Sequence, residues 1–260
     1  MLWLFEQIEE LDDDFLMRLL PRISSERRER ILRLRDKSAR IQSIAAELLL
    51  RYSIRQEFGI VELPVISSDE NGKPYFPAIP EICFNLSHCK TAAACGVDAT
   101  PLGVDVQEID CLRDAKSNEF LQRKRSCVSM PFSVWKEKEE TVQSILWVLH
   151  GAERDWVLSG EAPAERERRF ITVWTYKEAF GKMTGAGILY DLERYNFLPC
   201  MESGVGYDSC FQSVQRKNAV LTACTQSPLE LRIVSIRELF SSAPPAPLNL
   251  MKKKERTKLC

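Results

Sequence analysis

The sequence lacks any long apolar run and any excess of charge of one sign. It carries 36 Lys and Arg against 37 Asp and Glu, a formal net charge of -1 over 260 residues. No overall field therefore selects nucleic acid or an anionic membrane as a partner, and recognition of phosphate has to be local. The apolar start Leu2–Phe5 is broken by Glu6, too early for a signal peptide or a membrane span. We expect a cytoplasmic protein with no nucleic-acid and no membrane partner.

Histidines and paired cysteine motifs are also scarce. There are only 2 His, and none of the 9 Cys forms a Cys-x-x-Cys pair. A zinc site built from Cys and His is therefore poorly supported, and reduced thiols are expected. Cys83, Cys95 and Cys224 lie in apolar runs, where cysteine packs as a small hydrophobe. No Walker glycine loop or Rossmann fingerprint is present, so a nucleotide would have to be held by side chains.

Hydrophobic residues make up 45% of the sequence, which is enough for a core. Their periodicity predicts elements in the order strand, helix, strands. The predicted strands are 2–8, 82–86, 92–97, 102–106, 211–225 and 229–236. The first predicted helix is capped by Ser24 or Ser25, breaks near 35–38 and continues to Tyr52. Two more helices are predicted at 153–159 and 170–183. Asn71-Gly72, followed by Lys73-Pro74, predicts a tight hairpin.

The element order of the second half repeats that of the first, without a visible sequence repeat. We therefore expect an N-terminal lobe at 1–101 and a C-terminal lobe at 102–240. Poor periodicity and high charge at about 111–152 indicate an insertion, and the Pro-rich, basic stretch 241–260 indicates a disordered tail.

Two carboxylates stand out as candidates for chemistry. Asp105 lies between Val104 and Val106 in a predicted strand, so its side chain faces away from theirs. Taken alone, it reads more readily as a turn cap or the partner of a nearby cation. Glu178 shares one helix face with Trp174 and Lys182 in WTYKEAFGK, where a plain surface ion pair is the usual explanation. Gly185 and Gly187 follow, and glycine there would let backbone approach a ligand closely, although a helix C-cap explains Gly185 equally well.

Candidate phosphate contacts lie upstream of these carboxylates. FNLSH at 84–88 ends a predicted strand with Ser87 and His88, although a lone His at a strand end is more often structural. Arg27, Arg30 and Arg40 by default belong to a solvated helix face.

In the order basic helix, NGKP, FNLSH, PLGVDVQ and WTYKEAFGK followed by TGAG, these pieces resemble the surfactin-type 4'-phosphopantetheinyl transferase family. The resemblance covers about Ile23 to Ile188. It implies an α+β fold of two similar lobes about a pseudo-twofold, each a small, mostly antiparallel sheet packed with a long helix. It places coenzyme A in a cleft between the lobes. The implied reaction moves phosphopantetheine from coenzyme A to a serine of an apo acyl or peptidyl carrier protein, and releases adenosine 3',5'-bisphosphate.

The resemblance also implies roles for individual residues. Asp105 and Glu178 match the Mg²⁺ ligands. Coenzyme A phosphate contacts are implied at Arg27, Arg30, Lys73, Ser87 and His88. Many relatives carry a third acid where this chain has Gln107, whose amide oxygen could still bind the ion; weaker or altered metal binding is the expectation.

For the chemistry, we expect Glu178 to accept the serine proton and Lys182 to stabilise the leaving group, with Asp105 completing the catalytic set and Lys177 as a secondary phosphate contact. Two lobes in one chain favour a monomer. Two alternatives stay open: a Mg²⁺-dependent phosphohydrolase that uses the same carboxylates, and a non-catalytic homologue that binds coenzyme A or carriers.

Overall fold

The computed structural model describes residues 1–20, 23, 25–109, 146–185 and 192–241. Their helices and strands in chain order are β1 (Leu2–Phe5), η1 (Ile8–Glu10), α1 (Asp13–Leu19), α2 (Ser25–Leu32), α3 (Lys37–Phe58), β2 (Ser67–Ser68), β3 (Pro74–Tyr75), β4 (Cys83–His88), β5 (Ala93–Asp98), β6 (Gly103–Glu108), η5 (Leu146–Val148), α6 (Gly151–Leu158), α7 (Pro163–Thr184), η6 (Leu192–Arg194), α8 (Leu198–Ser203), β7 (Val205–Gly206), β8 (Ser209–Gln215), β9 (Ala219–Thr225), β10 (Leu231–Ile233) and α9 (Ile236–Ser241). The predicted α+β class is confirmed.

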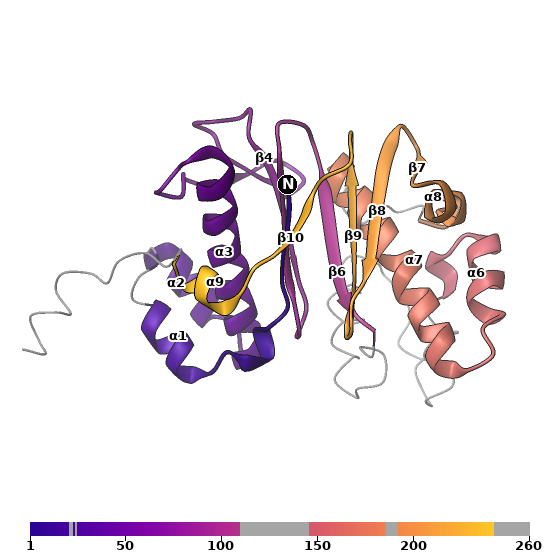
Figure 1. Ribbon diagram of the computed structural model, residues 1–260, viewed down its shortest axis with the longest axis horizontal. Coiled ribbons are helices and arrows are strands. Elements are labelled where there is room, and N and C mark those ends of the chain that lie inside the picture. Colours follow the sequence, from indigo (N-terminus) through magenta and orange to yellow (C-terminus); the bar gives the residue numbers. More distant parts are fainter. Residues whose placement is uncertain (21–22, 24, 110–145, 186–191, 242–260) are drawn as a thin grey trace, which may run out of the picture.

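The first sheet has the strand order β10-β1-β5-β4 and is covered on one face by α3 (Figure 1). Its pairs are antiparallel except that β10 runs parallel to β1, with Leu2 opposite Leu231. Because side chains alternate along a strand, Trp3 and Phe5 pack toward α3 while Leu2 and Leu4 face the other way. Residues 231–240, which the sequence places in the second lobe, therefore lie with the elements of the first sheet.

The second sheet is antiparallel throughout, in the order β6-β9-β8-β7, and α7 covers it. Gly103 begins β6 directly under this helix. A Cβ atom there would collide with the backbone of α7 at Ala179 and Met183. Only glycine lets the helix lie this close to the strand.

The two sheets pack face to face, so the layers run α3, first sheet, second sheet, α7 (Figure 1). Leu4 and Ala94 from the first sheet share a core with Val104, Val106 and Leu221 from the second. This places the strands that carry the predicted site, β4 and β6, next to each other. The pseudo-twofold relation and the ligand cleft stay predictions.

The predicted break in the first long helix is present. α2 ends at Leu32 and α3 begins after Asp36, whose Oδ1 accepts a hydrogen bond from the Ser38 N–H at 3.1 Å. Gly59, with φ 68°, ends α3 in the left-handed conformation that favours glycine. At the predicted hairpin Gly72 has φ 82°, and β2 pairs with β3 as expected.

Most of the predicted insertion at about 111–152 lies outside the described residues, as does the predicted tail beyond residue 241. Its described end is not separate from the core. Leu146, Val148 and Leu149 are buried in a cluster with Phe170 and Trp174 of α7. These residues therefore help to anchor the outer side of α7.

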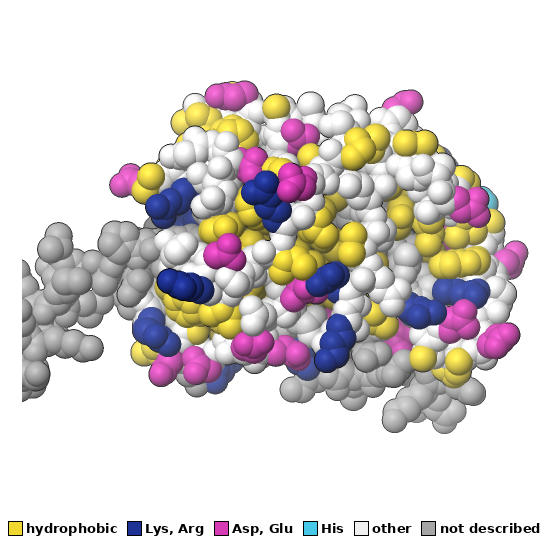
Figure 2. All heavy atoms as spheres, in the orientation of Figure 1, with side chains coloured by type: hydrophobic (Ala, Val, Ile, Leu, Met, Phe, Trp, Pro, Cys, Tyr) yellow, Lys and Arg dark blue, Asp and Glu magenta, His cyan; other side chains and the backbone are white. Residues whose placement is uncertain are grey.

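Basic and acidic side chains are mixed with apolar ones on the face that Figure 2 shows. This distribution agrees with the near-zero net charge. In the described part of the chain, no helix is both long and apolar enough to cross a membrane.

Candidate active site

Asp105 is the centre of the candidate site. It lies in the middle of β6, on the α7 face of the sheet, and is only 1% exposed. Its Oδ1 accepts hydrogen bonds from Ser87 Oγ at 2.9 Å and from Lys182 Nζ at 2.6 Å. Its Oδ2 accepts one from Gln107 Nε2 at 3.1 Å. A buried carboxylate needs such partners, and here they come from β4, from α7 and from β6 itself.

α7 supplies the second carboxylate and the cation. Lys182 Nζ donates to the Val104 carbonyl at 3.0 Å as well as to Asp105, and its side chain is 27% exposed. Glu178 is half-buried one turn earlier on the same helix. Residues four apart in a helix share a face, so Glu178 and Lys182 both project on the β6 side. The structure thus joins the WTYKEAFGK and PLGVDVQ segments as the sequence predicted.

Lys73 reaches the end of the same helix from the β2–β3 hairpin. Its Nζ donates to the Met183 carbonyl at 2.7 Å, and a Cβ at Gly185 would lie 3.7 Å from its Cδ. The last carbonyls of a helix lack intrahelical partners and carry partial negative charge, which suits an ammonium group. Burial lowers the pKa of Lys73, because a partly desolvated ammonium is less stable in its charged form, while Cys83 acts in the opposite direction.

Ser87 and His88 end β4 with different surroundings. The buried Ser87 hydroxyl donates to Asp105 and accepts a hydrogen bond from the Val106 N–H at 3.2 Å, so both of its hydrogen bonds go to β6. His88 is exposed, with its Nδ1 3.3 Å from Gln42 Oε1 on α3. A coenzyme A contact at either residue stays a prediction.

The two predicted arginines belong to α2. Arg27 Nε lies 3.0 Å from Glu47 Oε2 and its Nη2 donates to Ser43 Oγ at 3.3 Å, which ties α2 to α3. Arg30 is exposed in the last turn of α2. Both remain candidates for the phosphate contacts that the family resemblance implies.

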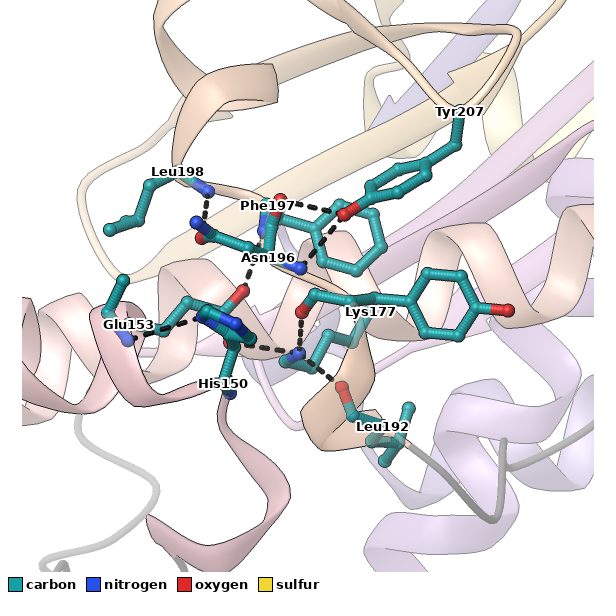
Figure 3. A network of polar contacts seen from close by, with 10 residues as sticks. His150, Glu153, Lys177, Leu192, Asn196, Phe197, Leu198 and Tyr207 are labelled. Atoms are coloured by element: carbon teal, nitrogen blue, oxygen red, sulfur yellow. Dashed lines mark hydrogen bonds and ion pairs between the residues drawn. The ribbon is translucent and has the colours of Figure 1, made fainter.

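Lys177 lies in a buried polar network with Glu153. Its ammonium is 0% exposed and lies 2.9 Å from Glu153 Oε2, and it donates to the carbonyls of Leu192 and Tyr195 at 2.7 Å each (Figure 3). All of its donors are therefore used inside the protein, on the side of α7 away from β6. These contacts argue against the predicted phosphate contact at Lys177, because in this arrangement the buried ammonium has no donor left for a phosphate.

The oxygen donors near Asp105 suit a magnesium ion. Mg²⁺ binds a small number of carboxylates together with waters and substrate phosphates, and it prefers hard oxygen ligands. Asp105 and Glu178 provide such oxygens, and Gln107 is already hydrogen-bonded to Asp105. The described residues contain no group of three or more His, Cys, Asp and Glu side chains that could hold a metal.

Three polar residues that contact predicted site residues or their strand were missed by reasoning from sequence. Gln42 contacts His88, Asn85 binds the backbone of β6, and Glu153 pairs with Lys177. Asn85 could have been found, because it precedes Ser87 by two residues and must share its strand face. Gln42 and Glu153 gave no local signal, since each meets its partner across a long stretch of chain.

Comparison with known proteins agrees with this geometry. Residues 101–216 match the sequence model of the 4'-phosphopantetheinyl transferase superfamily. The chain is 27% identical to 4'-phosphopantetheinyl transferase psf-1 of Bacillus pumilus, over 88% of this chain and 92% of that protein. It is 24% identical to 4'-phosphopantetheinyl transferase Sfp of Bacillus subtilis strain 168, over 86% and 92%, and 28% identical to 4'-phosphopantetheinyl transferase pptA of Paxillus involutus, over 71% and 68%.

The α+β fold is consistent with that of a phosphopantetheinyl transferase. The matched region contains Asp105, Glu178 and Lys182, the residues that the structure gathers on β6 and α7. The family match and these relatives support the surfactin-type 4'-phosphopantetheinyl transferase family that the motifs indicated.

Proposed function

We propose that this protein transfers phosphopantetheine from coenzyme A to a serine of an apo carrier protein in a magnesium-dependent reaction. The observation that carries the proposal is the contact of three separate motif segments at one carboxylate. Asp105 from PLGVDVQ, Ser87 from FNLSH and Lys182 from WTYKEAFGK meet within hydrogen-bonding distance. Relatives with the name 4'-phosphopantetheinyl transferase match most of the chain, which supports the same activity.

The reaction exchanges one P–O bond for another. The serine Oγ attacks the β-phosphorus of coenzyme A, and the bond to the oxygen shared with the α-phosphate breaks. Adenosine 3',5'-bisphosphate leaves with that electron pair. Such a transfer depends on positioning and on neutralisation of charge more than on covalent help from the protein.

Each residue of the site has a task in this scheme. Glu178 accepts the proton of the serine hydroxyl, directly or through a water molecule. Lys182, already beside Asp105 and partly exposed, stabilises the charge that develops on the leaving bisphosphate. Lys73 and His88 hold the coenzyme A phosphates on the side of the first sheet.

Asp105, Glu178 and Gln107 would hold the magnesium ion. When bound, the ion neutralises phosphate charge and so makes phosphorus more open to attack. Because the Gln107 amide is neutral, the positive charge of the ion would be balanced by the two carboxylates and the phosphates.

A direct test is to incubate the protein with coenzyme A, Mg²⁺ and a panel of apo acyl and peptidyl carrier proteins. Intact-mass spectrometry should show carriers that gain one phosphopantetheine group. Asp105→Ala and Glu178→Ala should abolish the gain. Asp155→Ala, which removes an exposed carboxylate on α6, is the matched control and should transfer as the wild type does.

The same assay separates this proposal from its alternatives. Transfer to no carrier at all would refute the proposed activity. Release of free phosphopantetheine without a carrier would point to a hydrolase, and tight coenzyme A binding in calorimetry without transfer would point to a non-catalytic homologue. Addition of EDTA should stop transfer if the reaction depends on magnesium.

A further inference from the structure

The two sheets are joined at their edges by side chains instead of backbone pairing. β4 is the last strand of the first sheet and β6 is the last strand of the second. In an antiparallel edge strand, every second N–H points away from its only neighbour and needs another acceptor. On β6 these outward groups include the N–H of Val104 and of Val106.

Two side chains of β4 accept these bonds in a regular order. Asn85 Oδ1 accepts from the Val104 N–H at 2.9 Å, and Ser87 Oγ accepts from the Val106 N–H at 3.2 Å. The two acceptors and the two donors are each two residues apart, so the contacts follow the period of the strands. Asn85 is 5% exposed and Ser87 is 7% exposed, so both bonds are shielded from water. We call this pair of contacts the edge joint.

Asp105 lies between the two anchored N–H groups. Its neighbours Val104 and Val106 are held through their N–H groups by Asn85 and Ser87, and its carboxylate accepts a hydrogen bond from the Ser87 hydroxyl. The same strand β4 ends at His88, on the side where coenzyme A phosphates are expected. The edge joint therefore fixes the distance between the carboxylate on β6 and the end of β4, where the resemblance implies phosphate contacts.

We propose that Asn85 is a positioning residue that holds β6 against β4 and so sets where Asp105 meets the pyrophosphate. This inference rests on the proposed transferase function. Asn85 is bonded to backbone and not to Asp105 itself, so it acts through the strand. Displacement of a catalytic group by a fraction of an ångström reduces transition-state stabilisation without weakening contacts that other residues make with the substrate.

The test compares three replacements of Asn85. Asn85→Ala removes the acceptor, and Asn85→Leu removes it while filling the space, in case the alanine variant does not fold. Asn85→Ser places a hydroxyl on the same strand face as Ser87, whose own hydroxyl already accepts a β6 N–H, and should restore the bond. Gln212→Ala is the matched control, because Gln212 also binds backbone across elements, at Leu229, but away from Asp105.

Two independent readouts are measured. Hydrogen exchange of the Val104 amide, followed by NMR without metal or coenzyme A, reports the joint itself. It should speed up in the alanine and leucine variants and return toward wild type in the serine variant. In the transfer assay the same two variants should lose kcat by about tenfold and need more Mg²⁺ for half-saturation, with KM for coenzyme A unchanged.

A purely structural Asn85 would give a different pattern. The inference would be overturned if the Asn85 variants lost thermal stability but kept the wild-type kcat per folded molecule and the wild-type Mg²⁺ requirement. That is the pattern expected for Gln212→Ala. Failure of the serine variant to recover would also overturn it. If the wild type transfers to no carrier, the proposed function fails, whereas unchanged Val104 exchange in the alanine and leucine variants refutes the joint alone.

Discussion

Replacement of Lys177 by methionine tests whether the buried ion pair with Glu153 is structural. Both side chains are 0% exposed, and the ammonium also donates to the Leu192 and Tyr195 carbonyls. Glu153 additionally accepts the His150 and Phe197 N–H groups, so the pair joins α6, α7 and the start of α8 (Figure 3). Methionine keeps most of the side-chain volume, and the loss is therefore that of charge and hydrogen bonds.

The expected loss of stability follows from the burial of both partners. Removal of one partner of a buried pair costs about 3–5 kcal/mol, because the other charge stays buried without compensation. For a chain of this size that corresponds to a fall in Tm of roughly 6–20 °C. Two backbone N–H groups still serve Glu153 after the change, which favours the lower part of this range. Burial also lowers the pKa of Lys177, although Glu153 opposes that shift.

The assay is thermal and urea unfolding together with transfer activity per folded molecule at low temperature. Lys177→Met should unfold early but transfer normally, whereas Lys182→Met should fold and not transfer. The double variant Lys177→Met/Glu153→Gln should be more stable than Lys177→Met alone, because it buries no uncompensated charge. Wild-type stability combined with weaker coenzyme A binding in Lys177→Met would refute the reasoning and restore Lys177 as a phosphate contact.

Three further predictions concern the site. Since burial lowers the pKa of Lys73, coenzyme A binding should weaken as pH rises through that lowered pKa, and binding near it should take up a proton. Calorimetry in buffers of different ionisation enthalpy should show this proton uptake, and Lys73→Arg should remove it. Gly103→Ala should destabilise the protein by about 1–3 kcal/mol in urea unfolding, because the new Cβ meets the α7 backbone, and wild-type stability would contradict the close approach. Gln107→Glu should lower the Mg²⁺ concentration for half-maximal transfer, and an unchanged Mg²⁺ titration would show that this position does not act on the ion.

Local patterns predicted the elements of the site well. Alternation along 102–106 placed Asp105 opposite its valine neighbours, and the spacing of Glu178 and Lys182 placed them on one helix face. The polar stretch 35–38 marked the helix break, where Asp36 now caps α3. Each of these features depends on residues within one or two turns of each other.

Contacts between distant segments were beyond the reach of such patterns. β10 inserts in parallel beside β1, although they stand at opposite ends of the described chain. The helix α1, capped by Asp12, was also missed. Helical periodicity places Lys177 and Lys182 on different faces of α7. No local signal showed that residues 192–195 would cover the Lys177 side chain.

The arrangement of the two sheets explains why the candidate site needs residues from both. Asp105 lies on an edge strand, and an edge strand has a free row of N–H groups that only a neighbouring element can satisfy. β4 provides that neighbour through Asn85 and Ser87, and the Ser87 hydroxyl also donates to the carboxylate of Asp105. Packing of the sheet edges and assembly of the site are thus one event. A substitution that loosens the edge joint should impair chemistry before it unfolds either sheet, because the apolar clusters that pack α3 and α7 do not include Asn85 or Ser87.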